Sequence, residues 1–292
     1  MLQGLAASPV SILIVTLDVI LGFDMDPVFI ISLGVLGAVT GLAAGLLGIG
    51  GGMILVPFLT LMLGWTDLNP NLVVKAAIAT SMASILFTSV SSVTAHHKKG
   101  AVRWKLVFAF APGIFIGSLF AKYVFEKLPT SWLALLFALF VAYSGLQMLL
   151  DKKPKPTRQM PGTPGTVVAG TGIGFLSGLV GAGGGFVSVP FMAWCNVPLR
   201  EAIGTSAALG FPIALFNTIQ YAQMSDGVLA DTMIGLVYWP ALLILAAFSV
   251  LTAPVGARLA HKLPVKQLKK VFAYLLFGLS AYMAHKAYVA FI

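Results

Sequence analysis

GLLGIGGGMILVPF, residues 45–58, is an apolar segment that a cluster of glycines interrupts near its middle. The run GLVGAGGGFVSVPF at residues 178–191 repeats it, with identity at 9 of 14 positions. Self-similarity of this kind indicates an internal duplication. Successive glycines favour the end of one helix and the start of another. The sequence therefore predicts two copies of one unit, each built around a broken helix.

Two shorter matches extend the duplication along each copy. KAAIATS at residues 75–81 corresponds to REAIGTS at 200–206, and the tripeptide KLP occurs at both 127–129 and 262–264. Each copy therefore reads as a helix, a short helix after the glycines, and three more helices. We expect these helices at 27–47, 53–63, 73–95, 104–123 and 132–150 in the first copy, and at 165–180, 186–195, 201–223, 232–253 and 265–291 in the second.

The composition places these helices in a lipid bilayer. Hydrophobic residues make up 59% of the 292 residues and charged residues only 9%. The mean hydropathy of +0.97 is too high for a water-soluble domain. The fold class is therefore an all-α polytopic membrane protein with two repeats and glycine-broken segments. Its expected parts are an N-terminal transmembrane helix in residues 1–23, a first repeat at 27–150, a cytoplasmic linker at 151–164 and a second repeat at 165–292.

The distribution of basic residues predicts how the copies are oriented. Lysine and arginine collect on the cytoplasmic side of a membrane. The loop after the third helix is basic in the first copy, at 96–105, and acidic in the second, at 225–231. Equivalent loops therefore face opposite sides, so each copy crosses an odd number of times and the repeats are inverted. The N-terminus is then cytoplasmic and the C-terminus periplasmic. The glycine segments form either hairpins or two crossings, and the shortness of 53–63 favours a re-entrant hairpin.

The glycine breaks are the best candidates for a binding site. Non-helical backbone at membrane depth must be buried in protein or line a wet cavity, and the N–H groups at a helix start attract an anion. Close helix packing is the competing interpretation, but the duplication favours a transport pathway. A repeated Thr-Ser pair offers further donors, unless its hydroxyls bond to their own helix. The predicted substrate-binding residues are Gly50, Gly51, Gly52, Thr80, Ser81, Gly183, Gly184, Gly185, Thr205, Ser206 and Asn217.

Motifs of other functional classes are absent from the sequence. It contains no nucleotide-binding P-loop, no protease or esterase motif and no Cys/His cluster at metal spacing. We therefore expect no enzyme, no cofactor and no metal site. His96 and His97 fall in a basic loop and are expected to be solvated. The expected partners are the lipid bilayer and a small anionic substrate, without nucleic acid, because the net charge of +9 comes from too few residues for a basic face. A homo-oligomer and coupling to protons or another ion both stay open.

The paired GLLGIGGG and GLVGAGGG runs, each followed by a helix that opens on a Thr-Ser pair, resemble the TauE/SafE family of sulfite and organosulfonate transporters. The resemblance covers residue 27 to the end. It implies a secondary transporter of the bacterial cytoplasmic (inner) membrane that moves sulfite, an organosulfonate or a related sulfur oxyanion, commonly outward. The alternatives are an anion channel, an uptake permease for another small organic anion, a membrane scaffold and a cation carrier. Few carboxylates lie in the apolar segments, which counts against the cation carrier.

Overall fold

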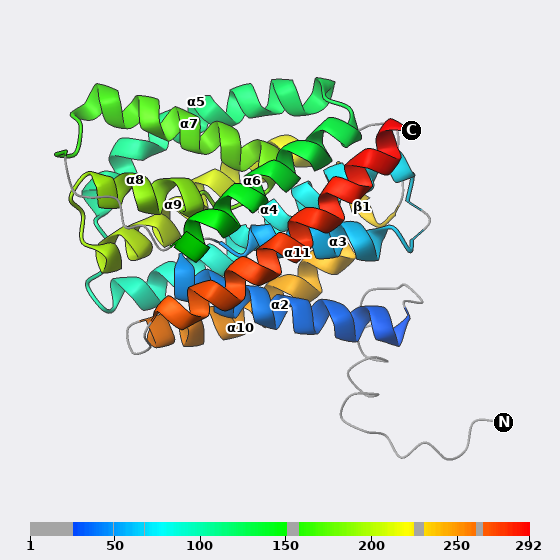
Figure 1. Ribbon diagram of the computed structural model, residues 1–292, viewed down its shortest axis with the longest axis horizontal. Coiled ribbons are helices and arrows are strands. Elements are labelled where there is room, and N and C mark those ends of the chain that lie inside the picture. Colours follow the sequence, from blue (N-terminus) through cyan, green and yellow to red (C-terminus); the bar gives the residue numbers. More distant parts are fainter. Residues whose placement is uncertain (1–25, 49, 67, 151–157, 225–230, 261–264) are drawn as a thin grey trace, which may run out of the picture.

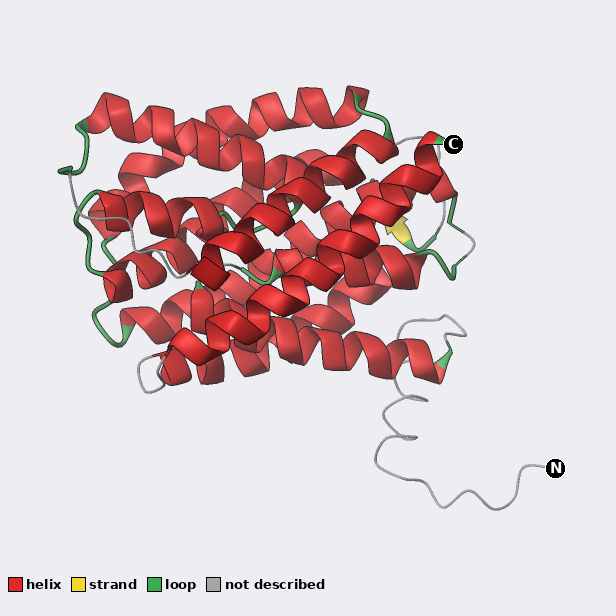
Figure 2. Cartoon of the chain, viewed as in Figure 1, coloured by secondary structure: helices red, strands yellow, loops and turns green. Residues whose placement is uncertain are grey.

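The computed structural model describes residues 26–48, 50–66, 68–150, 158–224, 231–260 and 265–292, with the backbone alone at 265–269. The expected N-terminal helix and the first half of the expected linker lie outside these residues. The described chain folds into ten helices and one short β-hairpin (Figures 1 and 2). The helices are α2 (Pro27–Leu47), α3 (Gly52–Leu63), α4 (Pro70–His97), α5 (Trp104–Lys127), α6 (Thr130–Leu150), α7 (Thr163–Val180), α8 (Gly185–Trp194), α9 (Leu199–Ala222), α10 (Trp239–Ala260) and α11 (Val265–Phe291), and the strands are β1 (Met233–Ile234) and β2 (Val237–Tyr238).

The prediction of an all-α polytopic membrane protein is confirmed. Within the described residues, seven helices are long and apolar enough to cross a membrane: α2, α4, α5, α6, α7, α9 and α10. The helices that follow the glycines are shorter, with 12 residues in α3 and 10 in α8. At about 1.5 Å per residue, neither spans a hydrocarbon core of roughly 30 Å.

Local sequence accounts for the start of two membrane helices. Asp26 and Asn69 each precede a proline, which suits the first helical position because its missing N–H has no partner there anyway. The Asp26 carboxylate accepts a hydrogen bond from the Val28 amide at 2.8 Å, and the Asn69 side chain accepts one from the Asn71 amide at 3.0 Å. These caps fix where α2 and α4 begin.

The prediction of a helix from residue 232 is wrong, because residues 233–238 form the β-hairpin and α10 begins only at Trp239. Met233 pairs with Tyr238 across the hairpin. Gly235 in the turn has a φ of 60°, a left-handed conformation that no helix contains. The Tyr238 amide donates to the Thr80 hydroxyl of α4 at 2.9 Å. The hairpin is therefore tied to the helical core instead of extending α10.

The helices pack in pairs that join the two copies. α2 of the first copy packs along α10 of the second, and α7 of the second packs along α5 of the first. The last helices, α6 and α11, pack on one another, and α4 meets α9. Figure 1 shows α5 with α7 at one edge of the molecule and α2 with α10 at the other. The first helix of each copy therefore packs against the other copy.

Glycines bring two of these pairs into backbone contact. A methyl group on Gly45 of α2 would lie 2.1 Å from the Ala253 carbonyl oxygen of α10. One on Gly113 of α5 would lie 2.0 Å from the Val167 carbonyl oxygen of α7. Both distances are far below van der Waals contact. Close packing, the competing interpretation of the glycines, is therefore correct at these two crossings.

Each broken helix pair turns back toward the end of the molecule from which it starts. In Figure 1, α2 starts at the right of the view and α3 lies at that same end, whereas α8 lies at the left, where α7 starts. The two pairs therefore enter from opposite ends. This arrangement agrees with a hairpin rather than with two full crossings.

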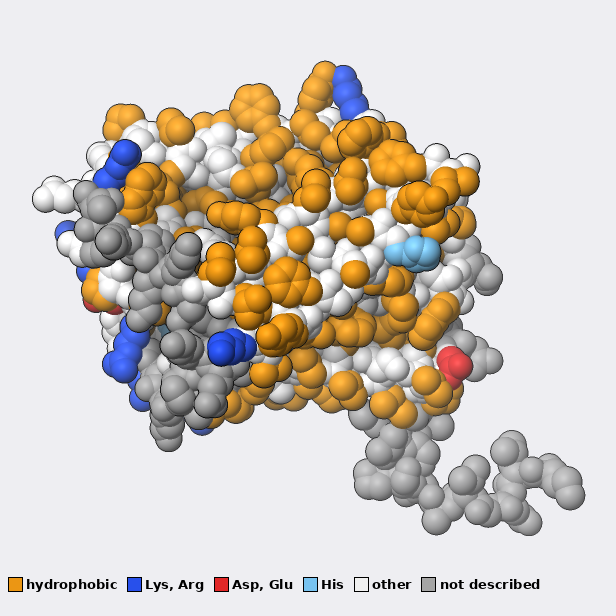
Figure 3. All heavy atoms as spheres, in the orientation of Figure 1, with side chains coloured by type: hydrophobic (Ala, Val, Ile, Leu, Met, Phe, Trp, Pro, Cys, Tyr) orange, Lys and Arg blue, Asp and Glu red, His pale blue; other side chains and the backbone are white. Residues whose placement is uncertain are grey.

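The outer surface has an apolar belt and a basic end. In Figure 3, hydrophobic side chains cover the middle of the visible face, and most of the visible Lys and Arg side chains gather at its left. This is the end at which α11 begins (Figure 1). Such a distribution suits a protein whose middle lies in lipid and whose charged ends meet water.

Candidate functional site

Each break is a short left-handed turn of backbone between two helices. Gly48 has a φ of 66° and Gly51 one of 76°, and their counterparts Gly181 and Gly184 have 72° and 75°. Glycine adopts such angles without strain, which explains why the same residue recurs in both copies. Gly51 and Gly184 precede α3 and α8, and neither helix start has a capping hydrogen bond from the residue before it. The first-turn N–H groups carry the positive end of the helix dipole at each break.

The two breaks touch one another. A methyl group on Gly50 would lie 2.9 Å from Gly183 Cα, and one on Gly52 would lie 2.1 Å from the Gly181 carbonyl oxygen. No side chain larger than hydrogen fits between such surfaces without moving the backbone. The structure therefore brings the glycines of both copies together at one place in the interior, which we call the junction.

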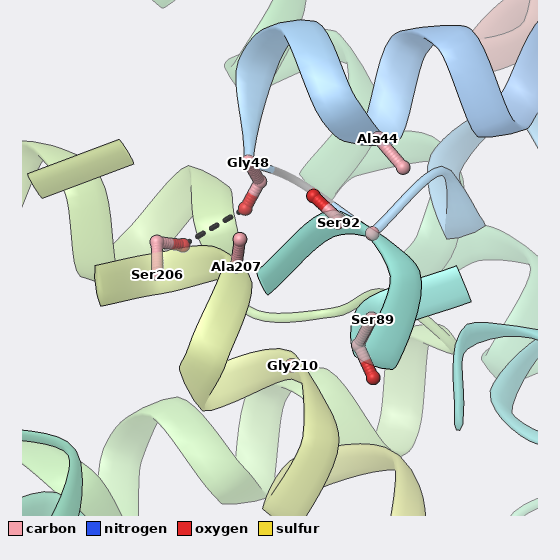
Figure 4. Close-up of a pocket in the computed structure, with 8 residues that line it drawn as sticks. Ala44, Gly48, Ser89, Ser92, Ser206, Ala207 and Gly210 are labelled. Atoms are coloured by element: carbon pink, nitrogen blue, oxygen red, sulfur yellow. Dashed lines mark hydrogen bonds between the residues drawn. The ribbon is translucent and has the colours of Figure 1, made fainter. Parts of the chain in front are cut away.

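Two serines cross-link the junction. The Ser81 hydroxyl on α4 donates to the Gly181 carbonyl at 3.0 Å, and the Ser206 hydroxyl on α9 donates to the Gly48 carbonyl at 2.9 Å (Figure 4). Each serine belongs to one copy and binds the break of the other. These bonds therefore connect the copies, rather than running along a single helix as the sequence also allowed.

The threonine before each serine, Thr80 or Thr205, accepts a hydrogen bond from the residue just before a helix of the other copy. Thr205 accepts a hydrogen bond from the Arg103 amide at 3.0 Å, directly before α5. Thr80 accepts one from the Tyr238 amide at 2.9 Å, directly before α10. Since α5 and α10 are equivalent helices, the Thr-Ser pair makes the same two contacts in both copies. Both threonines lie outside the cavity described next.

A narrow cavity lies on one side of the junction (Figure 4). Its interior volume of about 10 Å³ is close to what one water molecule needs. None of the described residues that line it is charged, and all of them are small. They come from α2, the first break, α4 and α9, and are Ala44, Gly48, Gly50, Ser89, Ser92, Ser206, Ala207 and Gly210. Of the predicted site residues, Gly50 and Ser206 line this cavity.

Ser92 brings an unused hydrogen-bonding group to the cavity. The residue is 2% exposed, and its hydroxyl has no partner among the described residues. Ser89, by contrast, donates to the Leu86 carbonyl at 3.0 Å. A buried hydroxyl without a partner is costly, so a ligand that accepts its hydrogen bond stabilises the site. Sequence reasoning missed both serines, although their spacing of three in TSVSSVT at 88–94 places them on one helix face.

His96 is not the solvated loop residue that the sequence predicts. α4 continues through His97, and the His96 ring is buried with 1% exposure. Its Nε2 lies 3.0 Å from the Gly45 carbonyl oxygen, one turn before the first break. In the second copy the Tyr221 hydroxyl donates to the Gly178 carbonyl in the same way. In each copy, therefore, a side chain near the end of α4 or α9 binds a backbone carbonyl in the last turn of α2 or α7. His97 is exposed, as predicted.

Asn217 lies apart from the cavity, against α5. Its side-chain nitrogen donates to the Ile213 carbonyl at 2.7 Å and to the Ser118 hydroxyl of α5 at 3.1 Å. The structure therefore does not bring Asn217 together with Gly50 and Ser206 around one ligand.

Comparison with known proteins identifies the family. The sequence profile described as "Sulfite exporter TauE/SafE" matches residues 33–283, which is most of the chain. The chain belongs to the TauE/SafE family. The resemblance seen in the glycine runs is confirmed.

Relatives of this TauE/SafE chain carry transporter descriptions. It is 34% identical to a probable membrane transporter protein of Haemophilus influenzae over 85% of this chain and 95% of that protein. It is 26% identical to a probable membrane transporter protein of Methanocaldococcus jannaschii over 85% of this chain and 93% of that protein. No solved structure gives a significant match. The TauE/SafE chain is thus a multi-pass membrane protein related to membrane transporters.

Proposed function

We propose that this chain is a secondary transporter that exports a small sulfur oxyanion, such as sulfite or an organosulfonate, across the bacterial cytoplasmic membrane by alternating access. One observation carries the proposal: the buried Ser92 hydroxyl has no partner among the described residues and lines a cavity beside a helix break. The family supports the class of substrate, and the relatives support transport rather than catalysis.

The hydrogen-bonding groups of the cavity suit a compact oxyanion, which can enter only when the water-sized cavity widens. Sulfite and sulfonate groups present three oxygens, each able to accept hydrogen bonds from hydroxyls and N–H groups. The Ser92 hydroxyl can donate such a bond, and the start of α3 supplies positive potential from its helix dipole. Because the residues that line the cavity carry no charge, recognition depends on hydrogen bonds rather than on an ion pair.

The difference between the two copies beside the junction supports alternating access. The positions of α4 equivalent to Ala207 and Gly210 carry Met82 and Ile85, and both of these side chains are fully buried. The position beside the second break that is equivalent to the cavity is therefore next to two large side chains instead of two small ones. In a protein with inverted repeats, such asymmetry is expected of one of two access states. Movement of one copy against the other would close this cavity and open the opposite side.

Ser92→Ala tests the site directly. We expect sulfite to raise the Tm of the purified protein, because a ligand that binds the folded state stabilises it. Losing one hydrogen bond to a charged ligand costs about 1.5–3 kcal/mol, so the variant should bind sulfite roughly 10- to 100-fold more weakly. Ser144→Ala is the matched control, since that hydroxyl donates to the Phe140 carbonyl of its own helix at 2.8 Å. Equal sulfite affinity in both variants would contradict the proposed site.

An anion channel is the main alternative, and counterflow in proteoliposomes distinguishes it. If the protein is a transporter, vesicles loaded with unlabelled sulfite should take up labelled sulfite faster than empty vesicles do. The reason is that a binding site occupied by sulfite reorients across the membrane faster than an empty one. A channel shows no such stimulation. Testing other small organic anions in the same assay, in vesicles of both orientations, separates export of sulfite from uptake of another anion.

We also propose that the basic end is cytoplasmic and the C-terminus periplasmic. Lys99 lies in the exposed loop after α4, and Ile292 is the exposed last residue. In a Cys195→Ala background, a membrane-impermeant maleimide applied from the periplasm should label Ile292→Cys and spare Lys99→Cys. Inside-out vesicles should reverse the pattern. Burial raises the pKa of the native Cys195 thiol, so background labelling is slow even before that cysteine is replaced. Labelling of Lys99→Cys from the periplasm would overturn the orientation.

A further inference from the structure

Three buried oxygen atoms near the second break have no hydrogen-bond partner within the described chain. They are Ser177 Oγ on α7 and the amide oxygens of Asn217 and Gln220 on α9. The three residues are 2%, 1% and 7% exposed, respectively. An unpartnered polar atom in the interior destabilises a protein unless a ligand or a water molecule completes its bonding. Each of these atoms is therefore available to a ligand or a buried water molecule.

The two amide side chains offer only their oxygens to such a ligand. Asn217 uses its nitrogen on the Ile213 carbonyl at 2.7 Å and on the Ser118 hydroxyl at 3.1 Å. Gln220 uses its nitrogen on the Phe216 carbonyl at 2.9 Å. A carbonyl oxygen needs an N–H group opposite it, which fixes the orientation of both amides. Since residues three apart share a helix face, this face of α9 presents two hydrogen-bond acceptors.

The amide oxygen of Asn217 and the hydroxyl of Ser177 both lie at the last turn of α7. A methyl group on Gly178 would lie 2.6 Å from the amide oxygen of Asn217, and one on Gly184 would lie 3.0 Å from the Ser177 hydroxyl. Ser177 and Gly178 belong to the turn that ends α7 at Val180. The carbonyl groups of a final turn carry the negative end of the helix dipole. Together with the amide oxygens, these carbonyl groups favour a cation on the α7 side of the break, opposite the positive start of α8.

We propose that Ser177, Asn217 and Gln220, with carbonyl groups from the last turn of α7, bind a sodium ion. Unwound backbone carbonyls and the C-terminal ends of broken helices coordinate Na⁺ in membrane transporters. A calcium or magnesium ion depends on carboxylates, and the described residues contain no group of three His, Cys, Asp or Glu side chains. A neutral set of oxygens matches a monovalent ion.

The first copy lacks this set of acceptors. When the glycine runs and the Thr-Ser pairs are aligned, the equivalents of Ser177, Asn217 and Gln220 are Ala44, Ser92 and Ala95. The first copy therefore offers a hydroxyl beside its break, where the second offers amide oxygens. One side of the junction can therefore donate a hydrogen bond to a ligand, and the other side can only accept one through its amides. In the proposed transporter, on which a coupling role rests, Na⁺ at the second break would bias the equilibrium between the two access states, because it binds one of them more tightly.

Thermal unfolding of the purified full-length chain tests the site. The Tm is measured in NaCl, KCl and choline chloride at constant ionic strength, without any oxyanion. We expect a saturable rise in Tm with Na⁺ that K⁺ and choline do not reproduce. Ser177→Ala should raise the half-saturating Na⁺ concentration at least about tenfold, since one ligand is lost. Gln220→Met, which keeps the size of the side chain and removes the oxygen, should do the same if Ser177→Ala fails to fold. Ser144→Ala, which removes a hydroxyl that donates within its own helix, should leave it unchanged.

The outcomes separate this inference from the proposed function. An equal Tm in all three salts, or a Na⁺ effect that survives both substitutions, would overturn the sodium site and leave the oxygens to buried water. A Na⁺ effect that depends on Ser177 or Gln220 supports the site, whether or not sulfite also shifts the Tm. A sulfite effect in choline chloride is a separate measurement that bears on the oxyanion cavity alone. Coupling is then read from sulfite counterflow in Na⁺ against choline.

Discussion

Gly52→Ala should abolish sulfite counterflow. The new methyl group would lie 2.1 Å from the Gly181 carbonyl oxygen and 2.8 Å from Ala182 Cα. Both neighbours are backbone atoms, so no side chain can rotate away and the two breaks must separate. That movement would also stretch the bond from Ser81 to the Gly181 carbonyl. Overpacking of this kind costs about 3 kcal/mol at the upper end of the usual range, and we expect a Tm lower by several degrees.

Gly172→Ala is the matched control for this experiment. It is the same substitution within a helix, and a methyl group there meets nothing within 4 Å. Alanine is the better helix former by about 1 kcal/mol, so its Tm and counterflow should equal or exceed those of the native chain. Native counterflow in Gly52→Ala would show that contact between the breaks is not needed for transport.

Ser206→Ala and Ser81→Ala should each weaken the connection between the copies. The first leaves the Gly48 carbonyl without the serine hydroxyl and also removes the acceptor of the Ser188 hydroxyl at 2.8 Å. The second leaves the Gly181 carbonyl without its partner from α4. Burying an unsatisfied acceptor costs about 1–3 kcal/mol. We therefore expect a loss of unfolding free energy of that size in each variant, with the larger loss for Ser206→Ala.

Denaturant titration of the two variants against Ser144→Ala measures this effect. The Phe140 carbonyl that Ser144 contacts also has the amide partner of its own helix, so its loss should cost about 0.5 kcal/mol, at the low end for a hydrogen bond. Counterflow should fall in both junction variants and persist in the control. Equal stability in all three variants would mean that the cross-copy bonds contribute nothing to holding the breaks together.

The repeat, the helix order and the membrane class could be predicted because each depends on local sequence. Apolar length reports a membrane helix, and the duplicated glycines report a break at the same place in each copy. The starts of α2 and α4 follow from Asp26 and Asn69 before proline. The hairpin at 233–238 could not be found in this way, since the contact of Tyr238 with Thr80 joins residues 158 positions apart.

The candidate site was only partly predictable for the same reason. The glycines can be recognised in the sequence because glycine adopts left-handed backbone conformations that other residues avoid. Ser92 and His96 belong to a helix whose apolar pattern is nearly uniform around its circumference, so periodicity does not tell which face meets the break. Ser177 and Gln220 stand out only because their buried side-chain oxygens have no partner among the described residues. Whether a side chain lacks a hydrogen-bond partner depends on tertiary contacts, which the neighbouring residues in the sequence do not reveal.

The packing of α2 on α10 and of α7 on α5 has a consequence for the ancestry of the chain. A single copy synthesised alone would expose the glycine face of its first helix to lipid and leave its break without a serine from outside. Two separate copies could satisfy each other only by pairing, so that each supplies the serine for the other's break. Joining the two copies in one polypeptide fixes their ratio at one to one and allows the halves to differ. Such divergence would allow serines to remain beside one break while amides arose beside the other.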